Sequence, residues 1–294
     1  MSAKRGMTLR AQWLGRQLRE LREAAGLKLP EAGDYIQRDG ATVSRLETGL
    51  YPARTPDVQA LLDLYGVADP HKRGDLMKLA TEVWHEGWWD GYSGNLSKLI
   101  VDYAWVESRA RVIRSFDALA IPGLLQTGNY MEAVIRQTDT DPSLAPSGAR
   151  FRLERQQILA AAEPPRIEAI LDEGLLRRPV GGPAGMKEQL ERLLDLGRRP
   201  AIDIRVLPFA SGAHAGHDGS FRIFEMPEPY PQIGYVDSPA GGIYIEAEGV
   251  DRLMLKFDRM RSDSPDPSES MKLIRTAINE FESSAEGDHV NPRA

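Results

Sequence analysis

The segment Gly26–Gly49 constrains this chain more than any other feature, because its signals predict a helix, a short turn and a second helix. Asp39 is a good N-cap residue for the second helix, since its carboxylate can accept a backbone N–H from the first turn. Gly49 stands where a left-handed residue commonly ends a helix. Between these ends, Val43 and Leu46 can share one buried stripe. We therefore expect a short second helix with one buried face.

The opposite face of this second helix is predicted to carry small side chains, a hydroxyl group and one arginine, at Gly40, Ala41, Ser44 and Arg45. Small residues let a helix backbone approach a surface closely. The major groove of DNA admits an α-helix, and arginine is the side chain that most often reads guanine there. The pattern favours a helix that reads DNA; the alternative is an ordinary helical hairpin without nucleic acid.

The same stretch resembles the helix-turn-helix of the Xre and phage-repressor family of DNA-binding proteins. The family register Gly-Leu…Val-Ser-Arg-Leu-Glu-x-Gly matches at Gly26–Leu27 and Val43–Gly49 without a gap. The resemblance implies that the helix at about 40–48 enters the major groove and that Arg22 and Glu47 form a buried structural pair. The base-contacting residues that it implies are Arg45, Ser44, Ala41, Gly40 and Thr42.

Two positions depart from that family pattern. The family often has Gln at the start of the first motif helix, where this chain has Leu29 followed by Pro30. The family's small core residue is usually Ala, and this chain has Gly33, which lowers helix stability. We expect both changes to affect how tightly the module binds DNA alone.

Positive charge is concentrated where the motif lies, although the net charge of the whole chain is −6. Residues 1–66 hold 10 Lys and Arg against 8 Asp and Glu, whereas the remainder holds 27 against 35. Contact with phosphates requires such local positive charge. Arg54 could equally be a free surface arginine. The arginines from which we expect phosphate contacts are Arg38, Arg54, Arg16 and Arg10.

Helix signals on both sides of the motif predict a repressor-like bundle of five helices over residues 8–83. Leu14, Leu18 and Leu21 form one face of a first helix that spans 10–25. Thr55-Pro56 and Asp69-Pro70 are start signals for two helices after the motif. The bundle would be the DNA-binding domain.

Residues 84–283 are predicted to form an α+β domain that regulates the protein, binds a partner and dimerises. Short alternating apolar runs suit a mainly antiparallel sheet that is covered on one face. Residues 284–294 are polar and are predicted to be a disordered tail. The expected strands lie at 167–171, 202–206, 221–223, 233–236 and 243–245, and the expected helices at 106–117, 128–137, 149–162, 186–196, 250–260 and 271–281.

This second part also resembles a known domain. The segments WWDGY, IPGLLQTGNY, FRLERQQ, LDEGLLRRPVGG, QLERLL, IRVLPF and GSF occur in the same order as in a regulatory domain of unclear biochemistry. That domain follows a helix-turn-helix in many actinobacterial regulators, which have been described as antitoxin-like and often sit beside a gene for a small acidic protein. The resemblance implies an alternative function, in which the chain binds the small acidic partner and autoregulates its own operon.

We expect no enzyme activity, no cofactor and no metal. His214, His217 and Asp218 form a pattern found in metal sites, but the segment is glycine-rich, and a polar connection between strands is the better interpretation. The chain has no cysteine. No apolar run approaches the roughly 18–20 residues of a membrane span, and residues 1–10 lack the apolar core of a signal peptide. These features predict a cytoplasmic, nucleoid-associated protein.

The sequence therefore predicts a transcriptional regulator that binds specific double-stranded DNA and is modulated through its second domain. A single module of this kind buries only about 600–1,000 Å² on DNA. Repressor-type modules typically bind as dimers to half-sites one helical turn apart. We therefore expect a homodimer, with the second domain as its interface. The sequence does not identify a small-molecule ligand.

Overall fold

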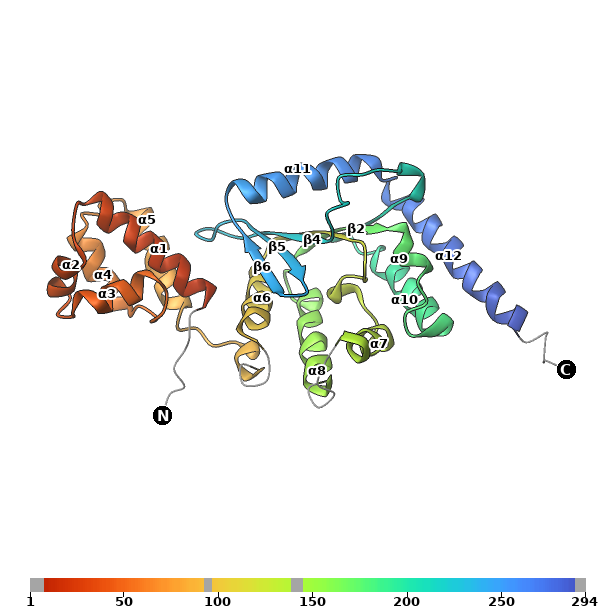
Figure 1. Cartoon of the computed structure of the whole chain (residues 1–294), viewed down its shortest axis with the longest axis horizontal. Coiled ribbons are helices and arrows are strands. Elements are labelled where there is room, and N and C mark those ends of the chain that lie inside the picture. The colour runs from red at the N-terminus through yellow and green to blue at the C-terminus, as the bar shows by residue number, and fades with distance from the viewer. Residues whose placement is uncertain (1–7, 93–96, 139–144, 289–294) are drawn as a thin grey trace. The chain divides into compact units, whose positions relative to one another are not determined.

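The computed structural model describes residues 8–92, 97–138 and 145–288, which form two compact units (Figure 1). One unit comprises residues 1–91 with 100–102, and the other comprises 92–99 with 103–294. The expected domain boundary between residues 83 and 84 stays a prediction.

The first unit is entirely helical where the structure describes it. A short 3-10 helix follows its α-helices, so the expected count of five is not exact. Thr8 begins the first helix by accepting a hydrogen bond from the backbone of Ala11 at 3.2 Å. The elements are α1 (Leu9–Ala24), α2 (Leu29–Tyr35), α3 (Gly40–Glu47), α4 (Thr55–Leu64), α5 (Pro70–Glu82) and η1 (Trp88–Tyr92).

The core of this unit is built from the apolar stripes of its helices. Leu14 and Leu18 of α1 are buried, as the heptad-like spacing predicts. Val43 of α3 and Leu61 of α4 are buried as well. Because α3 contributes one buried stripe to this core, its opposite face remains available to the surface.

The second unit contains a six-stranded mixed sheet in the order β3-β2-β1-β4-β5-β6. β1 pairs in parallel with β2, and β2 pairs in parallel with β3. The remaining neighbours are antiparallel. The expectation of a mainly antiparallel sheet therefore holds for three of the five strand pairings. The other two pairings, which join β1, β2 and β3, are parallel. The strands are β1 (Val112–Asp117), β2 (Arg166–Asp172), β3 (Ile202–Leu207), β4 (Phe221–Glu225), β5 (Ile233–Ser238) and β6 (Gly241–Ile245).

The helix expected over 106–117 is wrong in its second half. Helix α6 (Lys98–Arg109) ends at Arg109. Val112–Asp117 is the strand β1, which lies between β2 and β4. Arg114 of this strand is held by Glu168 and Glu225, each at 3.0 Å, on the neighbouring strands. These cross-strand ion pairs explain how a charged residue is accommodated in a central strand.

Helices cover both faces of the sheet, so the expectation of a sheet covered on one face is wrong. α11 lies along one face, while α6, α7 and α8 lie on the other (Figure 1). Ile223 belongs to the cluster that α11 covers, whereas the next residue, Phe224, packs edge-on against Tyr103 of α6. α12 continues five residues into the segment expected to be a tail, and residues 289–294 lie outside the described part. The remaining helices are α7 (Gly128–Thr138), α8 (Ala145–Arg155), α9 (Glu173–Arg177), α10 (Gly182–Leu196), α11 (Glu248–Asp263) and α12 (Pro267–Asp288), with 3-10 turns η2 (Gly123–Leu125), η3 (Gln156–Ala160) and η4 (Phe209–Ser211).

Two residues of the segment FRLERQQ tie this second unit together. Arg155 donates two hydrogen bonds of 2.7 Å to the buried carboxylate of Glu107 and lies over the ring of Tyr103 at 4.7 Å. Gln156 donates to the backbone carbonyls of Gly123 and Gln126. These contacts fix the segment IPGLLQTG after β1, so this part of the second resemblance reflects architecture.

Candidate nucleic-acid interface

The recognition helix candidate, α3, is closed at both ends by local interactions. The Asp39 carboxylate accepts the backbone N–H of Thr42 at 2.5 Å. Hydrogen bonding with the side chain of Thr42, and then with its backbone, holds the pKa of Asp39 below its usual value. At the other end, Gly49 has a φ of +72°, a conformation that side chains disfavour. A helix of only eight residues depends on such caps, because it has few internal hydrogen bonds.

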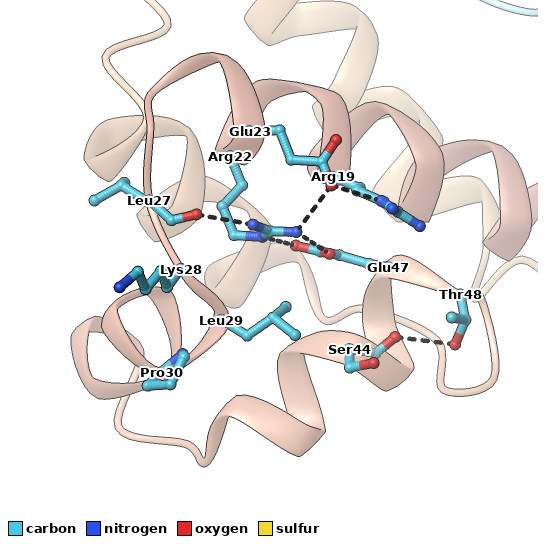
Figure 2. A pocket seen from close by; sticks show the side chains of 10 residues that line it. All are labelled: Arg19, Arg22, Glu23, Leu27, Lys28, Leu29, Pro30, Ser44, Glu47 and Thr48. Carbon is cyan, nitrogen blue, oxygen red and sulfur yellow. Dashed lines mark hydrogen bonds and ion pairs between the residues drawn. The ribbon is translucent and has the colours of Figure 1, made fainter.

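An ion pair anchors the buried side of α3 to α1. Arg22 Nε lies 2.6 Å from Glu47 Oε1, and Arg22 Nη2 lies 2.9 Å from Glu47 Oε2 (Figure 2). A third hydrogen bond runs from Arg22 Nη1 to the carbonyl of Leu27 at 2.8 Å. The hydrogen bond to Glu47 raises the pKa of Arg22. This bidentate pair fixes the helix orientation, and it is the pair that the family resemblance implies.

The residues expected to contact bases differ in exposure. Ala41 and Arg45 are exposed, whereas Gly40, Thr42 and Ser44 are half-buried. A Cβ atom at Gly40 would lie 3.0 Å from the backbone nitrogen of Pro30 in α2. The missing side chain of Gly40 therefore serves the packing of α3 against α2 as well as any approach to a groove.

Arg45 projects from the surface next to an aromatic ring. Its guanidinium carbon lies 5.4 Å from the centroid of the Tyr51 ring. Tyr51 itself is 42% exposed. The five N–H donors of a guanidinium lie in its plane, so contact of one face with a ring does not use them.

Three of the four arginines expected to contact phosphates are exposed. Arg16 and Arg54 are exposed, and Arg38 is exposed within 4.0 Å of the Asp57 carboxylate. These positions are compatible with phosphate contact.

The expectation for Arg10 is wrong, because its side chain is buried, with the residue only 3% exposed. Arg10 Nη1 donates to the backbone carbonyls of Glu82 at 2.9 Å and of His85 at 3.0 Å. The last carbonyls of a helix have no partner within it. Arg10 supplies such partners where α5 ends, so its role is structural.

A pocket of about 520 Å³ lies beside α3, where α1 and the start of α2 meet it (Figure 2). Lys28 and Arg19 bring positive charge to its wall, and Ser44 and Thr48 bring hydroxyl groups from α3. Lys28 was missed as a candidate contact; its place directly before α2 was the available signal. The full lining is Arg19, Arg22, Glu23, Leu27, Lys28, Leu29, Pro30, Ser44, Glu47 and Thr48.

The family departure at Gly33 has a steric explanation. A Cβ atom there would lie 2.8 Å from the backbone oxygen of Arg38 and 2.9 Å from the backbone nitrogen of Gly40. Both atoms belong to backbone, which cannot swing away as a flexible side chain can. Glycine at this position therefore allows the turn between α2 and α3 to pass closer to α2 than alanine would permit.

The histidine pattern of the second unit does not form a recognisable metal cluster within the residues that the structure describes. The His214 ring packs edge-on against Phe116, with centroids 5.5 Å apart. His217 lies 3.1 Å from Asp218, which also pairs with Lys256. Across the described ranges, none of the helices combines the length and the apolar character needed to span a bilayer.

Two family models match the sequence. Residues 13–76 match a helix-turn-helix domain. Residues 100–276, more than half of the chain, match DUF5753, a domain of unknown function. No curated protein and no solved structure matches the chain. The first match supports the interpretation of α2 and α3 as a DNA-binding motif, while the Xre subfamily and the actinobacterial origin stay predictions.

Proposed function

Because this chain belongs to the DUF5753 family and carries a helix-turn-helix domain, we propose that it is a sequence-specific, DNA-binding transcriptional regulator. In this proposal α3 enters the major groove of double-stranded DNA. Arg45 reads a base edge, while Ala41, Ser44, Thr42 and the backbone of Gly40 pack against bases or sugar-phosphate. A protein with this task acts on the nucleoid in the cytoplasm.

The observation that carries the proposal is the two-sided character of α3. Val43 and Glu47 are buried on one side, and the Arg22–Glu47 pair holds that side against α1. The other side presents Arg45 on a surface of small residues. Such a helix meets the two demands of groove insertion, a fixed orientation and a close backbone approach.

We assign modulation of this activity to the DUF5753 domain, and dimerisation with it. One module buries about 600–1,000 Å² on DNA, which is less than most specific complexes bury. Pairing of two chains would double the contact area and fix the spacing of two half-sites. The antitoxin-like role that the resemblance implies stays a prediction, as does the absence of enzyme activity.

The proposal is tested by selecting bound fragments from genomic DNA with the full-length chain and then titrating the selected duplex. Arg45→Ala should weaken binding by about 1–3 kcal/mol and relax the preference at one base pair. Arg275→Ala removes an exposed arginine of α12 and serves as the control, with affinity close to wild type. If Arg45→Ala kept both affinity and base preference, α3 would not be the reading helix.

A further inference from the structure

We infer that Tyr51 positions the guanidinium of Arg45 for base contact, an inference that rests on the proposed function. The Cζ atom of Arg45 lies 5.4 Å from the centroid of the Tyr51 ring. This distance is within the roughly 6 Å over which an aromatic face attracts a guanidinium. Tyr51 lies outside α3, and no helical periodicity connects it with the recognition face.

The backbone of the turn after α3 brings the two side chains together. Gly49, with its φ of +72°, reverses the chain direction at the end of the helix. The backbone N–H of Tyr51 then donates to the carbonyl oxygen of Arg45 at 3.1 Å. Because this hydrogen bond joins the same two residues, the turn itself places the ring beside the guanidinium.

The contact with Tyr51 leaves Arg45 able to bind a base. Within the described part of the first unit, no carboxylate lies within 4.0 Å of the Arg45 guanidinium. Asp39 interacts with Arg45 only through its charge, and the Tyr51 ring is the aromatic side chain that Arg45 contacts. A stacked ring covers the face of a guanidinium, while the five N–H donors lie in its plane. Those donors match the O6 and N7 atoms of guanine. Stacking before binding also reduces the side-chain freedom that Arg45 loses on DNA.

The experiment is a double-mutant cycle on the full-length chain, measured by titration of the selected DNA. Tyr51→Phe keeps the ring and removes the hydroxyl group, whereas Tyr51→Leu keeps an apolar side chain and removes the ring. Each is measured alone, and Tyr51→Leu is also combined with Arg45→Ala. Leu50→Ala changes the neighbouring exposed side chain of the same turn and is the control for damage to the turn.

We expect Tyr51→Phe and Leu50→Ala to bind as the wild type does. Tyr51→Leu should weaken binding about two- to fivefold, the size of an exposed cation–π contact, and relax the preference at the base pair that Arg45 reads. In the Arg45→Ala background, Tyr51→Leu should change nothing further, because the group it positions is absent.

Other outcomes would overturn the inference. An equal loss from Tyr51→Leu in both backgrounds would mean that Tyr51 touches DNA itself, and no loss in the wild-type background would mean that the ring is dispensable. A loss with Leu50→Ala as large as that with Tyr51→Leu would point to the turn alone. The proposed function fails separately, when the wild-type chain selects no DNA sequence or when Arg45→Ala has no effect.

Discussion

Two arginines of the first unit are buried for different reasons. Arg22 forms an ion pair with Glu47 and donates two hydrogen bonds, of 2.6 and 2.9 Å, to its carboxylate. Arg10 instead donates to backbone carbonyls near the end of α5. Neither guanidinium is available to DNA, so the 10 Lys and Arg of residues 1–66 overstate the positive charge that can reach phosphates. The exposed candidates are fewer, and Arg45, Arg54 and Lys28 are among them.

Removal of one partner from the buried pair should destabilise the first unit. Glu47→Ala removes the bidentate partner of the buried Arg22 guanidinium and leaves the exposed Glu23 carboxylate, 3.5 Å away, as a counter-charge. Removal of one partner from a buried pair typically costs about 3–5 kcal/mol. Denaturant unfolding followed by tryptophan fluorescence measures this loss, since Trp13 is buried in the same unit. Arg22→Met combined with Glu47→Leu should recover much of the stability, because the unpaired charge is then gone.

The matched control for this prediction is the exposed pair of Arg19 and Glu23 on the same helix, 2.8 Å apart. Arg19→Ala should leave unfolding close to wild type, because solvent screens exposed ion pairs. Equal effects of Glu47→Ala and Arg19→Ala would show that the Arg22–Glu47 pair contributes nothing beyond a surface pair.

At the level of elements, the end of α3 depends on a glycine for two separate reasons. Gly49 has a φ of +72°, and a Cβ atom there would lie 2.6 Å from the backbone nitrogen of Gln12 in α1. Gly66, which ends α4, has a similar φ of +67° but meets nothing within 4 Å. A side chain at Gly66 would therefore add backbone strain alone, whereas a side chain at Gly49 would add backbone strain and a clash with α1.

We expect Gly49→Ala to destabilise the fold more than Gly66→Ala does. Left-handed backbone costs a residue with a side chain about 1–2 kcal/mol at either position. Only Gly49→Ala adds a clash with the backbone of α1, which must move to relieve it. Thermal unfolding of both variants measures the difference, and DNA titration of Gly49→Ala should show weakened binding. Equal melting temperatures would mean that α1 and α3 separate without cost.

Local signals explain which elements could be predicted from the sequence. The N-cap at Asp39 and the C-terminal glycine at Gly49 act within a few residues, and α3 has the expected ends. β1 could not be recognised in the same way. Its character as a strand depends on pairing with β2 and β4. Arg114 of β1 pairs with Glu168 of β2 and Glu225 of β4, which lie about 50 and 110 residues later in the sequence.

The candidate site shows the same division between local and distant causes. The exposed position of Arg45 follows from helical periodicity around Val43 and Leu46. The burial of Arg10 depends on where the chain places the end of α5, more than 70 residues later. The contact between Tyr51 and Arg45 depends on the path of one turn. Neither of these last two features has a pattern in the sequence.

At the scale of the whole molecule, the distribution of charge matters more than its sum. The chain carries a net charge of −6, but the first 66 residues carry an excess of two positive charges and the rest an excess of eight negative ones. Phosphates attract the first part and repel the second. An acidic second domain therefore suits a role away from DNA, such as holding two DNA-binding domains together.

A dimer of this kind should respond to the spacing of its half-sites. Two linked recognition helices reach successive major grooves when the half-site centres are about 34–36 Å apart, or roughly 10–10.5 base pairs. Insertion of half a turn, about 5 base pairs, rotates one half-site to the opposite side of the duplex. We expect this insertion in the selected DNA to weaken binding of the full-length chain towards that of a single half-site, because one α3 then loses its groove.

The measurement is a titration of three duplexes with the full-length chain: the selected site, the site with half a turn inserted, and a single half-site as the control. Arg45→Ala should lower affinity for all three, and most for the intact site, where two copies of Arg45 are lost together. A chain that binds as a monomer would instead bind the selected site and the half-turn insertion equally, since each half-site is then read alone. That result would remove dimerisation from the proposal and leave base reading by α3 intact.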